Sequence, residues 1–237
     1  MARSGEAKGS PKGSGKRPYR AALLAVAVLG IGALAYAVIG GGGAVTEPVE
    51  LEGAESPQAL MERADPVPLG AEDAPITVIE FGDFQCPACG VFARQVKPFL
   101  EAEYIETGQV RLIFYDFPLI SIHEHAFLAA RAARCSADQG RYWEYHDRLF
   151  GAQPRWSSAR NPVSEFVEYA EELGLDADEF EGCVESDRHA DVVSASRELA
   201  LQLGVQSTPT VMVNGRQLVA ATDYDALKQM IEEELGG

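Results

Sequence analysis

The ten residues FGDFQCPACG, Phe81 to Gly90, contain two of the four cysteines of the chain, in a Cys-x-x-Cys spacing. They overlap the end of ITVIEFG (76–82), whose β-branched and aromatic residues are typical of a buried strand. The segment GVFARQVKPFLEAEYIE (90–106) has apolar residues at helical spacing, and QVRLIFYDFPL (109–119) predicts a second strand. The cysteine motif therefore lies at the strand-to-helix junction of a β-α-β unit.

The remainder of the chain adds helices and one hairpin to this unit. Thr208–Ala220 (TPTVMVNGRQLVA) predicts a hairpin, because the dipeptide Asn214-Gly215 is favoured in a tight type I′ turn. A final helix is expected at Tyr224–Leu235, and Pro98 is expected to kink the first helix. Further helical segments are expected at His123–Asp138, Arg141–Phe150, Pro162–Leu173, Asp176–Glu185 and Arg188–Leu203. This order predicts an α/β sheet with a helical insertion at about residues 120–204.

The charge of the chain is strongly negative and unevenly distributed. The net charge of −16 argues against a nucleic-acid partner, because phosphate binding requires a basic surface. Residues 1–20 contain six basic residues and one acid, which leaves 14 basic and 35 acidic residues in the rest of the chain. This basic segment is expected to be a disordered cytoplasmic tail.

Residues 21–40 (AALLAVAVLGIGALAYAVIG) contain no charged residue and are long enough to span a bilayer. The basic residues before them should keep the N-terminus in the cytoplasm and place the rest of the chain outside it. We expect a single-pass membrane anchor. The alternative is a signal peptide cleaved near Ala35-Tyr36-Ala37, which leaves a secreted or periplasmic protein. Residues 41–65 are expected to be a linker, and residues 66–237 the folded domain.

Three kinds of site are compatible with Cys86 and Cys89. In a redox site, the unpaired N–H groups and dipole of the helix N-terminus favour the Cys86 thiolate, while Cys89 is the deeper, resolving thiol. A zinc site usually needs a second close pair of ligands, which the isolated Cys135 and Cys183 do not supply. A structural Cys86–Cys89 bond would close too short a loop to stabilise much. We therefore expect a redox pair and no metal.

Cys135 and Cys183 both lie in predicted helices of the insertion. If they are bonded, they close a loop of about 49 residues, worth roughly 4 kcal/mol on the chain-entropy model. The predicted export of the domain favours this bond, and two separate buried thiols are the alternative.

Three segments resemble the DsbA-like thiol-disulfide oxidoreductases of the thioredoxin superfamily: LGAEDAPITVIEFGDFQCPAC, IHEHAFLAARAARCSADQGRYWEYHDRLF and LGVQSTPTVMVNG. The similarity covers about residues 66–235. Its middle segment is the more specific one, because thioredoxin itself lacks the helical insertion. The resemblance implies a thioredoxin fold with an inserted helical domain. It is most similar to the branch with a second, structural cysteine pair, whose positions Cys135 and Cys183 match.

The resemblance also implies the roles of individual residues. Cys86 is the nucleophile, Cys89 is the resolving thiol, and Glu80 is a buried acid that helps to move the proton of Cys89. The alternative for Glu80 is a surface carboxylate at the end of a strand. Thr208-Pro209 matches a loop with a cis proline, which would expose the backbone of residue 208 to an extended substrate strand.

Pro87 and Ala88, between the cysteines, are expected to contribute to the substrate-binding surface. The most oxidising members of the family have His where Ala88 stands, and Ala cannot support a thiolate, so a less oxidising couple is expected. His123 and His125, near the start of the first insertion helix, are candidates for the substrate surface, although packing or capping is favoured. Core or near-core positions are expected for Trp143, Tyr145 and His146.

Together these features predict an extracytoplasmic thiol-disulfide oxidoreductase that acts on exported proteins as a dithiol oxidase. The expected partners are reduced or partly folded exported proteins and a membrane quinone-linked thiol oxidase, or a reductant donor for the reverse direction. No cofactor is expected. An isomerase is disfavoured because residues 41–65 are too short for a separate dimerisation domain, and a monomer is expected. The alternatives are a disulfide reductase of a maturation pathway and a non-catalytic module that binds polypeptides or a metal.

Overall fold

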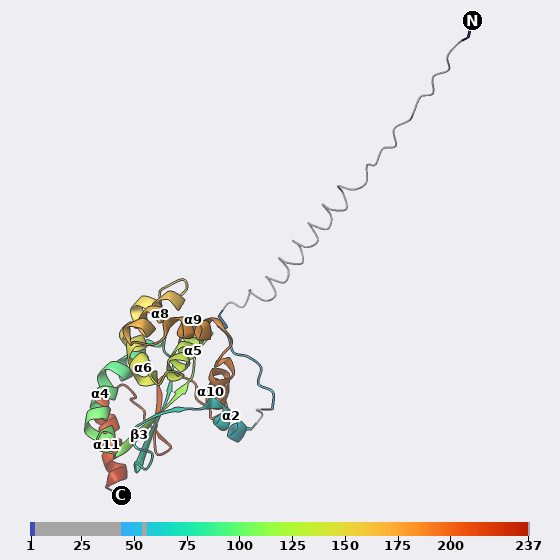
Figure 1. Cartoon of the computed structure of the whole chain (residues 1–237). Helices are drawn as coiled ribbons and strands as arrows, with labels where there is room; N and C mark the ends of the chain where they lie inside the picture. Colours follow the sequence, from blue (N-terminus) through green and yellow to red (C-terminus); the bar gives the residue numbers. More distant parts are fainter. Residues whose placement is uncertain (3–43, 54–55, 237) are drawn as a thin grey trace. The chain divides into compact units, whose positions relative to one another are not determined.

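The computed structural model of the chain describes residues 1–2, 44–53 and 56–236 (Figure 1). The expected membrane anchor, residues 21–40, lies outside the described residues, as does the expected cytoplasmic tail apart from Met1 and Ala2. In the described part of the chain, no helix combines the length and the hydrophobicity needed to cross a bilayer.

Within the described residues, five strands form one sheet in the order β1-β3-β2-β4-β5. Their bounds are Val67–Leu69 (β1), Ile76–Gly82 (β2), Val110–Asp116 (β3), Thr210–Val213 (β4) and Arg216–Gln217 (β5). Strands β2 and β3 are parallel, with Ile76 opposite Val110, while the other neighbours pair antiparallel. A parallel pair requires a crossover connection, and the helical run that starts after Cys86 supplies it. The predicted α/β fold is therefore confirmed.

The crossover is one continuous helical run that contains two π-helical turns. It consists of α3 (Pro87–Val91), the π-helical turn η1 (Phe92–Val96), α4 (Lys97–Leu100) and the π-helical turn η2 (Glu101–Ile105). Pro98, at which a kink was expected, lies in α4 between the two π-helical turns. Proline has no N–H to donate to the preceding turn, and the run accommodates it without an interruption of the helix.

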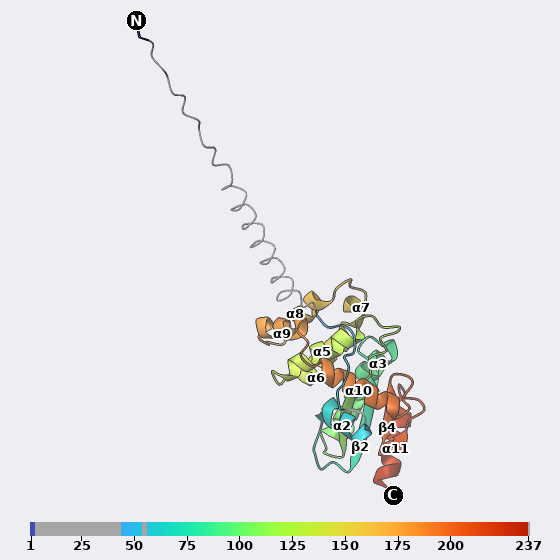
Figure 2. The same cartoon turned by 90° about the vertical axis from the view of Figure 1, so that its right-hand side faces the viewer.

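Helices cover both faces of the sheet, as Figures 1 and 2 show. On one face, α4 and α11 (Tyr224–Leu235) pack on alternate apolar side chains of the strands, such as Val78 and Leu112. On the other face, α2 (Pro57–Ala64) and α10 (Ala190–Gln202) pack on Phe81, Tyr115 and their neighbours. This alternation follows from the two-residue period of a strand, whose successive side chains point to opposite faces.

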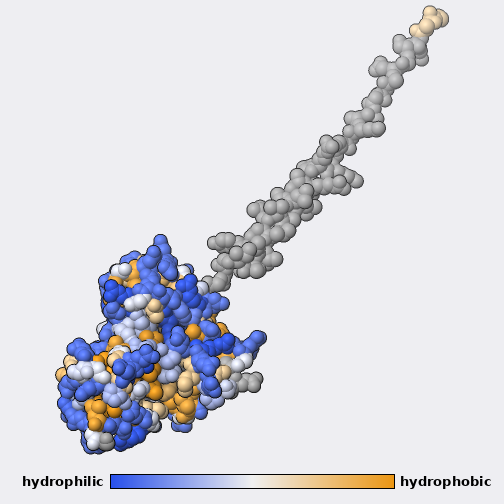
Figure 3. Space-filling view, turned by 60° about the horizontal axis from the view of Figure 1, so that its bottom comes forward, coloured by the Kyte–Doolittle hydropathy of each residue, from blue (hydrophilic) through white to orange (hydrophobic). Residues whose placement is uncertain are grey.

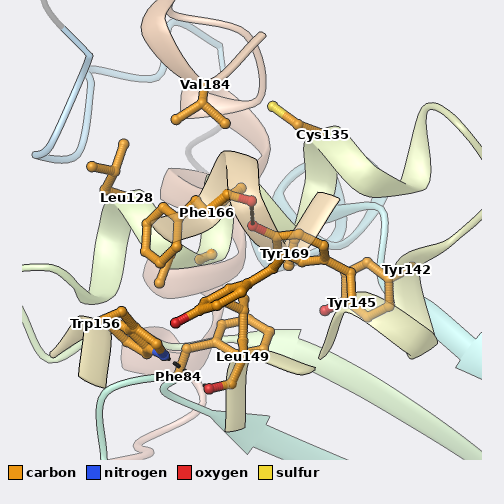
Figure 4. Packing of buried hydrophobic residues seen from close by; sticks show 14 of the residues in the cluster. Phe84, Leu128, Cys135, Tyr142, Tyr145, Leu149, Trp156, Phe166, Tyr169 and Val184 are labelled. Atoms are coloured by element: carbon orange, nitrogen blue, oxygen red, sulfur yellow. Dashed lines mark hydrogen bonds between the residues drawn. The ribbon is translucent and has the colours of Figure 1, made fainter. Parts of the chain in front are cut away.

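The helical insertion packs around its own aromatic core (Figure 4). Its helices are α5 (Ala126–Ala137), α6 (Tyr142–Gly151), α7 (Gln153–Trp156), α8 (Val163–Glu172) and α9 (Ala177–Glu185), followed by α10. Two buried polar groups in this core are paired: the Tyr145 hydroxyl donates to the Phe166 carbonyl and the Trp156 indole to the Leu149 carbonyl. Such pairing removes the cost of burying a lone donor.

The described residues of the expected linker, 44–53 and 56–65, pack against the domain. Val45 and Val49 lie against the core of the insertion, and Arg131 donates to the Val45 carbonyl at 2.6 Å. Helix α2 starts after the N-cap Ser56 and buries Leu60 completely against α10. The apolar residues of this segment are too widely spaced to be read as part of a core from the sequence alone.

Two further details bear on the expectations. The hairpin turn at Asn214 and Gly215 has φ values of 46° and 83°, the left-handed geometry of the type I′ turn. On the face shown in Figure 3, polar and charged residues predominate and hydrophobic residues form small groups between them. This surface agrees with the acidic composition of the chain.

Candidate thiol-disulfide exchange site

Cys86 and Cys89 lie at the start of the crossover helix, at the end of the central strand β2. Cys86 immediately precedes α3 and has extended backbone geometry, and Pro87 occupies the first helical turn. Cys89 follows one turn later and is completely buried, whereas Cys86 is 7% exposed. Both are free thiols, so this is the dithiol form of the pair.

The surroundings of the two thiols shift their pKa values in opposite directions. A hydrogen bond from the Cys89 thiol lowers the pKa of Cys86 to about 5, against the opposing effect of partial burial. The Thr208 side chain and the backbone N–H groups of Ala88 and Cys89 lower it further. Burial and the Cys86 sulfur raise the pKa of Cys89 well above its usual value. Cys86 is thus the thiolate at neutral pH and Cys89 the protonated thiol.

The peptide bond between Thr208 and Pro209 is cis and lies beside Cys86. In the thiol form, the Cys86 sulfur donates to the Thr208 carbonyl at 3.4 Å, which joins residues 122 positions apart. The Thr208 hydroxyl has no other partner among the described residues, so it is free to donate to the thiolate. Strand β4 begins at Thr210, directly after this loop.

Glu80 lies in β2, beneath the cysteine pair, and is completely buried. Neither carboxylate oxygen has a hydrogen-bond partner among the described residues. Burial raises the pKa of Glu80 to about 8, and the charge of Lys97 only partly opposes this. Lys97 is itself buried and donates to Glu101 and Asp147. The carboxyl of Glu80 therefore stays protonated to a higher pH than an exposed glutamate does.

Three polar residues hold the cysteine loop, and the sequence analysis did not single them out. The backbone carbonyl of Asp83 accepts from Cys86 N–H at 3.0 Å, and the Asp83 side chain accepts from Gln85 N–H at 2.7 Å. Gln153 of α7 donates to the carbonyls of Phe84 at 2.7 Å and Cys86 at 2.9 Å. The aspartate two residues before Gln85 is a local turn signal, whereas nothing near Gln153 in the sequence links it to residues 84–86.

Cys135 of α5 and Cys183 of α9 form a disulfide, with their Cα atoms 5.9 Å apart. The bond ties two helices of the insertion and is separate from the Cys86–Cys89 pair. His189 lies near these two sulfurs, in the one close group of three potential metal ligands among the described residues. Disulfide sulfurs are not thiolates and do not ligate zinc. This group of three residues is therefore not a zinc site.

The histidines and aromatic residues noted in the sequence have distinct positions. His125 precedes α5 and is buried. Its ring Nε2 lies 2.8 Å from the Ala159 carbonyl oxygen, and its backbone N–H donates to the side-chain oxygen of Gln85. His123 lies closer to the cysteine loop and contacts Asp83. Core positions are occupied by Tyr145 and His146, and Trp143 is partly buried.

Comparisons with known proteins agree with this geometry. A family profile described as “Thioredoxin” matches residues 62–233. “Probable disulfide bond formation protein D” of Bacillus anthracis is 34% identical over 169 residues, which cover 70% of this chain and 77% of that protein. “Disulfide bond formation protein D” of Bacillus subtilis is 32% identical over 183 residues, covering 71% and 77%. The crystal structure of oxidised BdbD from Bacillus subtilis has a TM-score of 0.67 at 27% identity, covering 82% of this chain and all of that one.

A thioredoxin fold with a Cys-x-x-Cys pair at a helix start defines a protein thiol-disulfide oxidoreductase. This chain belongs to the DsbA-like family of the thioredoxin superfamily. As an oxidoreductase of this class, it exchanges disulfides with substrate proteins and with a redox partner that restores the pair.

Proposed function

We propose that the protein oxidises dithiols in exported proteins through Cys86 and Cys89. The observation that carries this proposal is the position of Cys86 at the N-terminus of α3, where the hydrogen bond from Cys89 lowers its pKa to about 5. With that value, thiolate outnumbers thiol about a hundredfold at pH 7. A stabilised thiolate stabilises the reduced pair, and a pair that is stable when reduced is a good oxidant when oxidised.

The reaction begins with the oxidised Cys86–Cys89 disulfide. A substrate thiolate attacks the Cys86 sulfur, the S–S bond breaks, and Cys89 leaves and takes up a proton, for which Glu80 is the nearby donor. A second substrate thiolate then attacks the substrate sulfur of the mixed disulfide and releases Cys86 as a thiolate. The substrate loses two electrons and the cysteine pair gains them. The backbone of Thr208, with Pro209, Pro87 and Ala88, forms the surface on which an extended substrate segment lies.

The proposed location is the outer side of a cell membrane, with residues 21–40 as a single-pass anchor. The apolar composition of those residues and the basic flank before them support this topology. The substrates are reduced or partly folded exported proteins. A membrane quinone-linked thiol oxidase would accept the two electrons and return the pair to the disulfide. The enzyme would act as a monomer.

Trapping of substrates tests the catalytic roles. In Cys89→Ser, the Cys86 thiolate can attack a disulfide of a substrate and release the other substrate sulfur as a thiolate, but no Cys89 thiol is present to displace the bound substrate. The mixed disulfide should therefore accumulate and run as a high-mass species on a non-reducing gel. Cys86→Ser is the matched control and should trap nothing. Equal capture by both variants would contradict the proposed nucleophile, and capture by neither would favour a non-catalytic module that binds polypeptides.

The direction of electron flow is tested by the reduction potential against glutathione. The side chain of Ala88 offers no hydrogen bond to the thiolate, so the couple should be less oxidising than the strongest oxidants, at about −120 mV. A potential near −120 mV would contradict this expectation. A potential near that of thioredoxin, about −270 mV, would instead favour the second candidate, a disulfide reductase for a maturation pathway.

A further inference from the structure

The loop between β3 and α5 is bound to the cysteine loop at several points, and His123 is part of that junction. The Asp83 carboxylate lies 2.7 Å from Nδ1 of His123 and accepts from the Leu119 N–H at 2.8 Å. The neighbouring Phe117 N–H donates to the Gly82 carbonyl at 2.7 Å. The backbone N–H of His125 donates to the Gln85 side chain, which is the fourth hydrogen bond to the cysteine loop. These bonds fix the position of the His123 imidazole relative to the residues that carry Cys86.

Asp83 is the link between this imidazole and the reactive sulfur. It is buried, and its backbone is bonded to both cysteines: its carbonyl accepts from Cys86 N–H at 3.0 Å, and its N–H donates to the Cys89 sulfur at 3.4 Å. The His123 side chain is 16% exposed. The two residues between the cysteines, Pro87 and Ala88, carry no charge, so the Cys-x-x-Cys motif itself supplies no cation to the sulfur.

The charges that face His123 favour its protonated form. The hydrogen bond to Asp83 raises the pKa of His123, burial opposes the rise, and the Cys86 thiolate adds to it. The other titratable groups around the sulfur are Cys89, which is protonated, and Glu80 beneath it. Coupling between two titrating sites is reciprocal. An interaction that raises the pKa of His123 when Cys86 is ionised therefore lowers the pKa of Cys86 when His123 is protonated.

We propose that His123, held by the buried carboxylate of Asp83, supplies an imidazolium charge that stabilises the Cys86 thiolate and so makes the cysteine pair more oxidising. His123 acts on the reaction through Cys86 and not by contact with the substrate. The proposal rests on Cys86 as the reactive thiol. In the second half of the reaction, the S–S bond of the mixed disulfide breaks and its electron pair stays on Cys86. The imidazolium compensates that new negative charge without transferring its own proton.

The first test measures the His123 pKa in the two redox states by NMR. The four imidazoles of the chain are titrated in the oxidised protein and in protein reduced until two thiols are free, which leaves the Cys135–Cys183 bond intact. The His123 signal, assigned with His123→Gln, should titrate about one unit higher in the reduced protein, the low end of the range for a neighbouring opposite charge. His189, which pairs with Asp138 beside the structural disulfide, is the control and should titrate alike in both states.

The second test measures Cys86 itself, by thiolate absorbance at 240 nm and by equilibrium with glutathione. In His123→Gln the pKa of Cys86 should rise by about one unit. One pKa unit is a tenfold change in the equilibrium constant. Because a less stable thiolate makes the reduced pair less stable, the reduction potential should fall by about 30 mV. His123→Lys keeps the charge and should remain within about 0.3 unit of the parent. Circular dichroism and a thermal scan confirm that both variants are folded.

The outcomes separate this inference from the proposed function. An unchanged pKa of Cys86 in folded His123→Gln, or equal His123 titration in both redox states, would overturn the role of His123 while the trapping by Cys89→Ser still succeeds. A rise in the Cys86 pKa that His123→Lys does not reverse would also overturn it, because such a rise would reflect local packing and not charge. If Cys89→Ser traps no substrate but the pKa of His123 is higher in the reduced protein, the result would count against the proposed function alone.

Discussion

Replacing Glu80 by glutamine should make the stability of the domain less dependent on pH. Glu80 is completely buried, its two oxygens have no partner among the described residues, and burial raises its pKa from 4.5 to about 8. Between these values the native state holds a proton that the unfolded state has lost. Stability therefore falls as pH rises through this window. Below about pH 4.5 the carboxyl is neutral in both states and the effect is absent.

The size of the effect follows from the pKa difference. Each unit corresponds to about 1.4 kcal/mol, so the buried carboxyl costs about 3 kcal/mol at pH 7 and about 5 kcal/mol above pH 8. Glutamine has the same shape and is neutral at every pH. Its amide is buried without partners, as the protonated carboxyl is, so Glu80→Gln should match the parent at pH 4.5 and exceed it by about 3 kcal/mol at pH 7.

Guanidinium unfolding at pH 4.5, 7 and 8.5 measures this difference. The parent and the Glu80→Gln variant both carry serine at positions 86 and 89. No reductant is then needed, and the Cys135–Cys183 disulfide stays intact. The negative charge of Cys86 is absent in this background, but burial is the largest cause of the raised pKa of Glu80 and remains. Glu181→Gln, at an exposed position of α9, is the control and should follow the parent at each pH. A stability difference between Glu80→Gln and the parent that does not change with pH would refute the reasoning.

Two substitutions test the packing around the site. Asp116→Ala should lower the free energy of unfolding by about 3–5 kcal/mol in denaturant unfolding, because it leaves the side chain of Arg134, 2.6 Å away, buried without its counter-charge. A loss below about 1 kcal/mol would mean that the backbone carbonyls bonded to Arg134 are enough to stabilise its charge. Gly82→Ala should cost about 1–3 kcal/mol, because the added Cβ would lie 2.4 Å from a ring carbon of buried Phe114. Gly182→Ala, in α9 with open space around it, should instead gain about 0.5–1 kcal/mol, and equal effects at the two glycines would contradict the clash.

Local sequence patterns were sufficient for the elements that carry the cysteines. Strand β2 and helix α11 have the predicted bounds, and β3 begins one residue later and ends three residues earlier than predicted. The short strand β1 and helix α7 were not predicted. Three or four residues carry too little periodicity to be recognised, and their conformation depends on the neighbours that they contact.

The sequence by itself determined the α/β fold, the Cys-x-x-Cys motif at a strand-to-helix junction, and the hairpin turn at residues 214–215. These features depend on residues that are adjacent in the chain, so spacing and turn chemistry reveal them. Only the tertiary structure decided which distant groups surround the sulfurs. Gln153 reaches the carbonyl of Cys86, Asp83 holds His123, and Glu80 lies buried with no hydrogen-bond partner in the part of the chain that the structure describes. Their effect on the thiols depends on distance and burial, which are set when separate loops pack together and not by any local pattern.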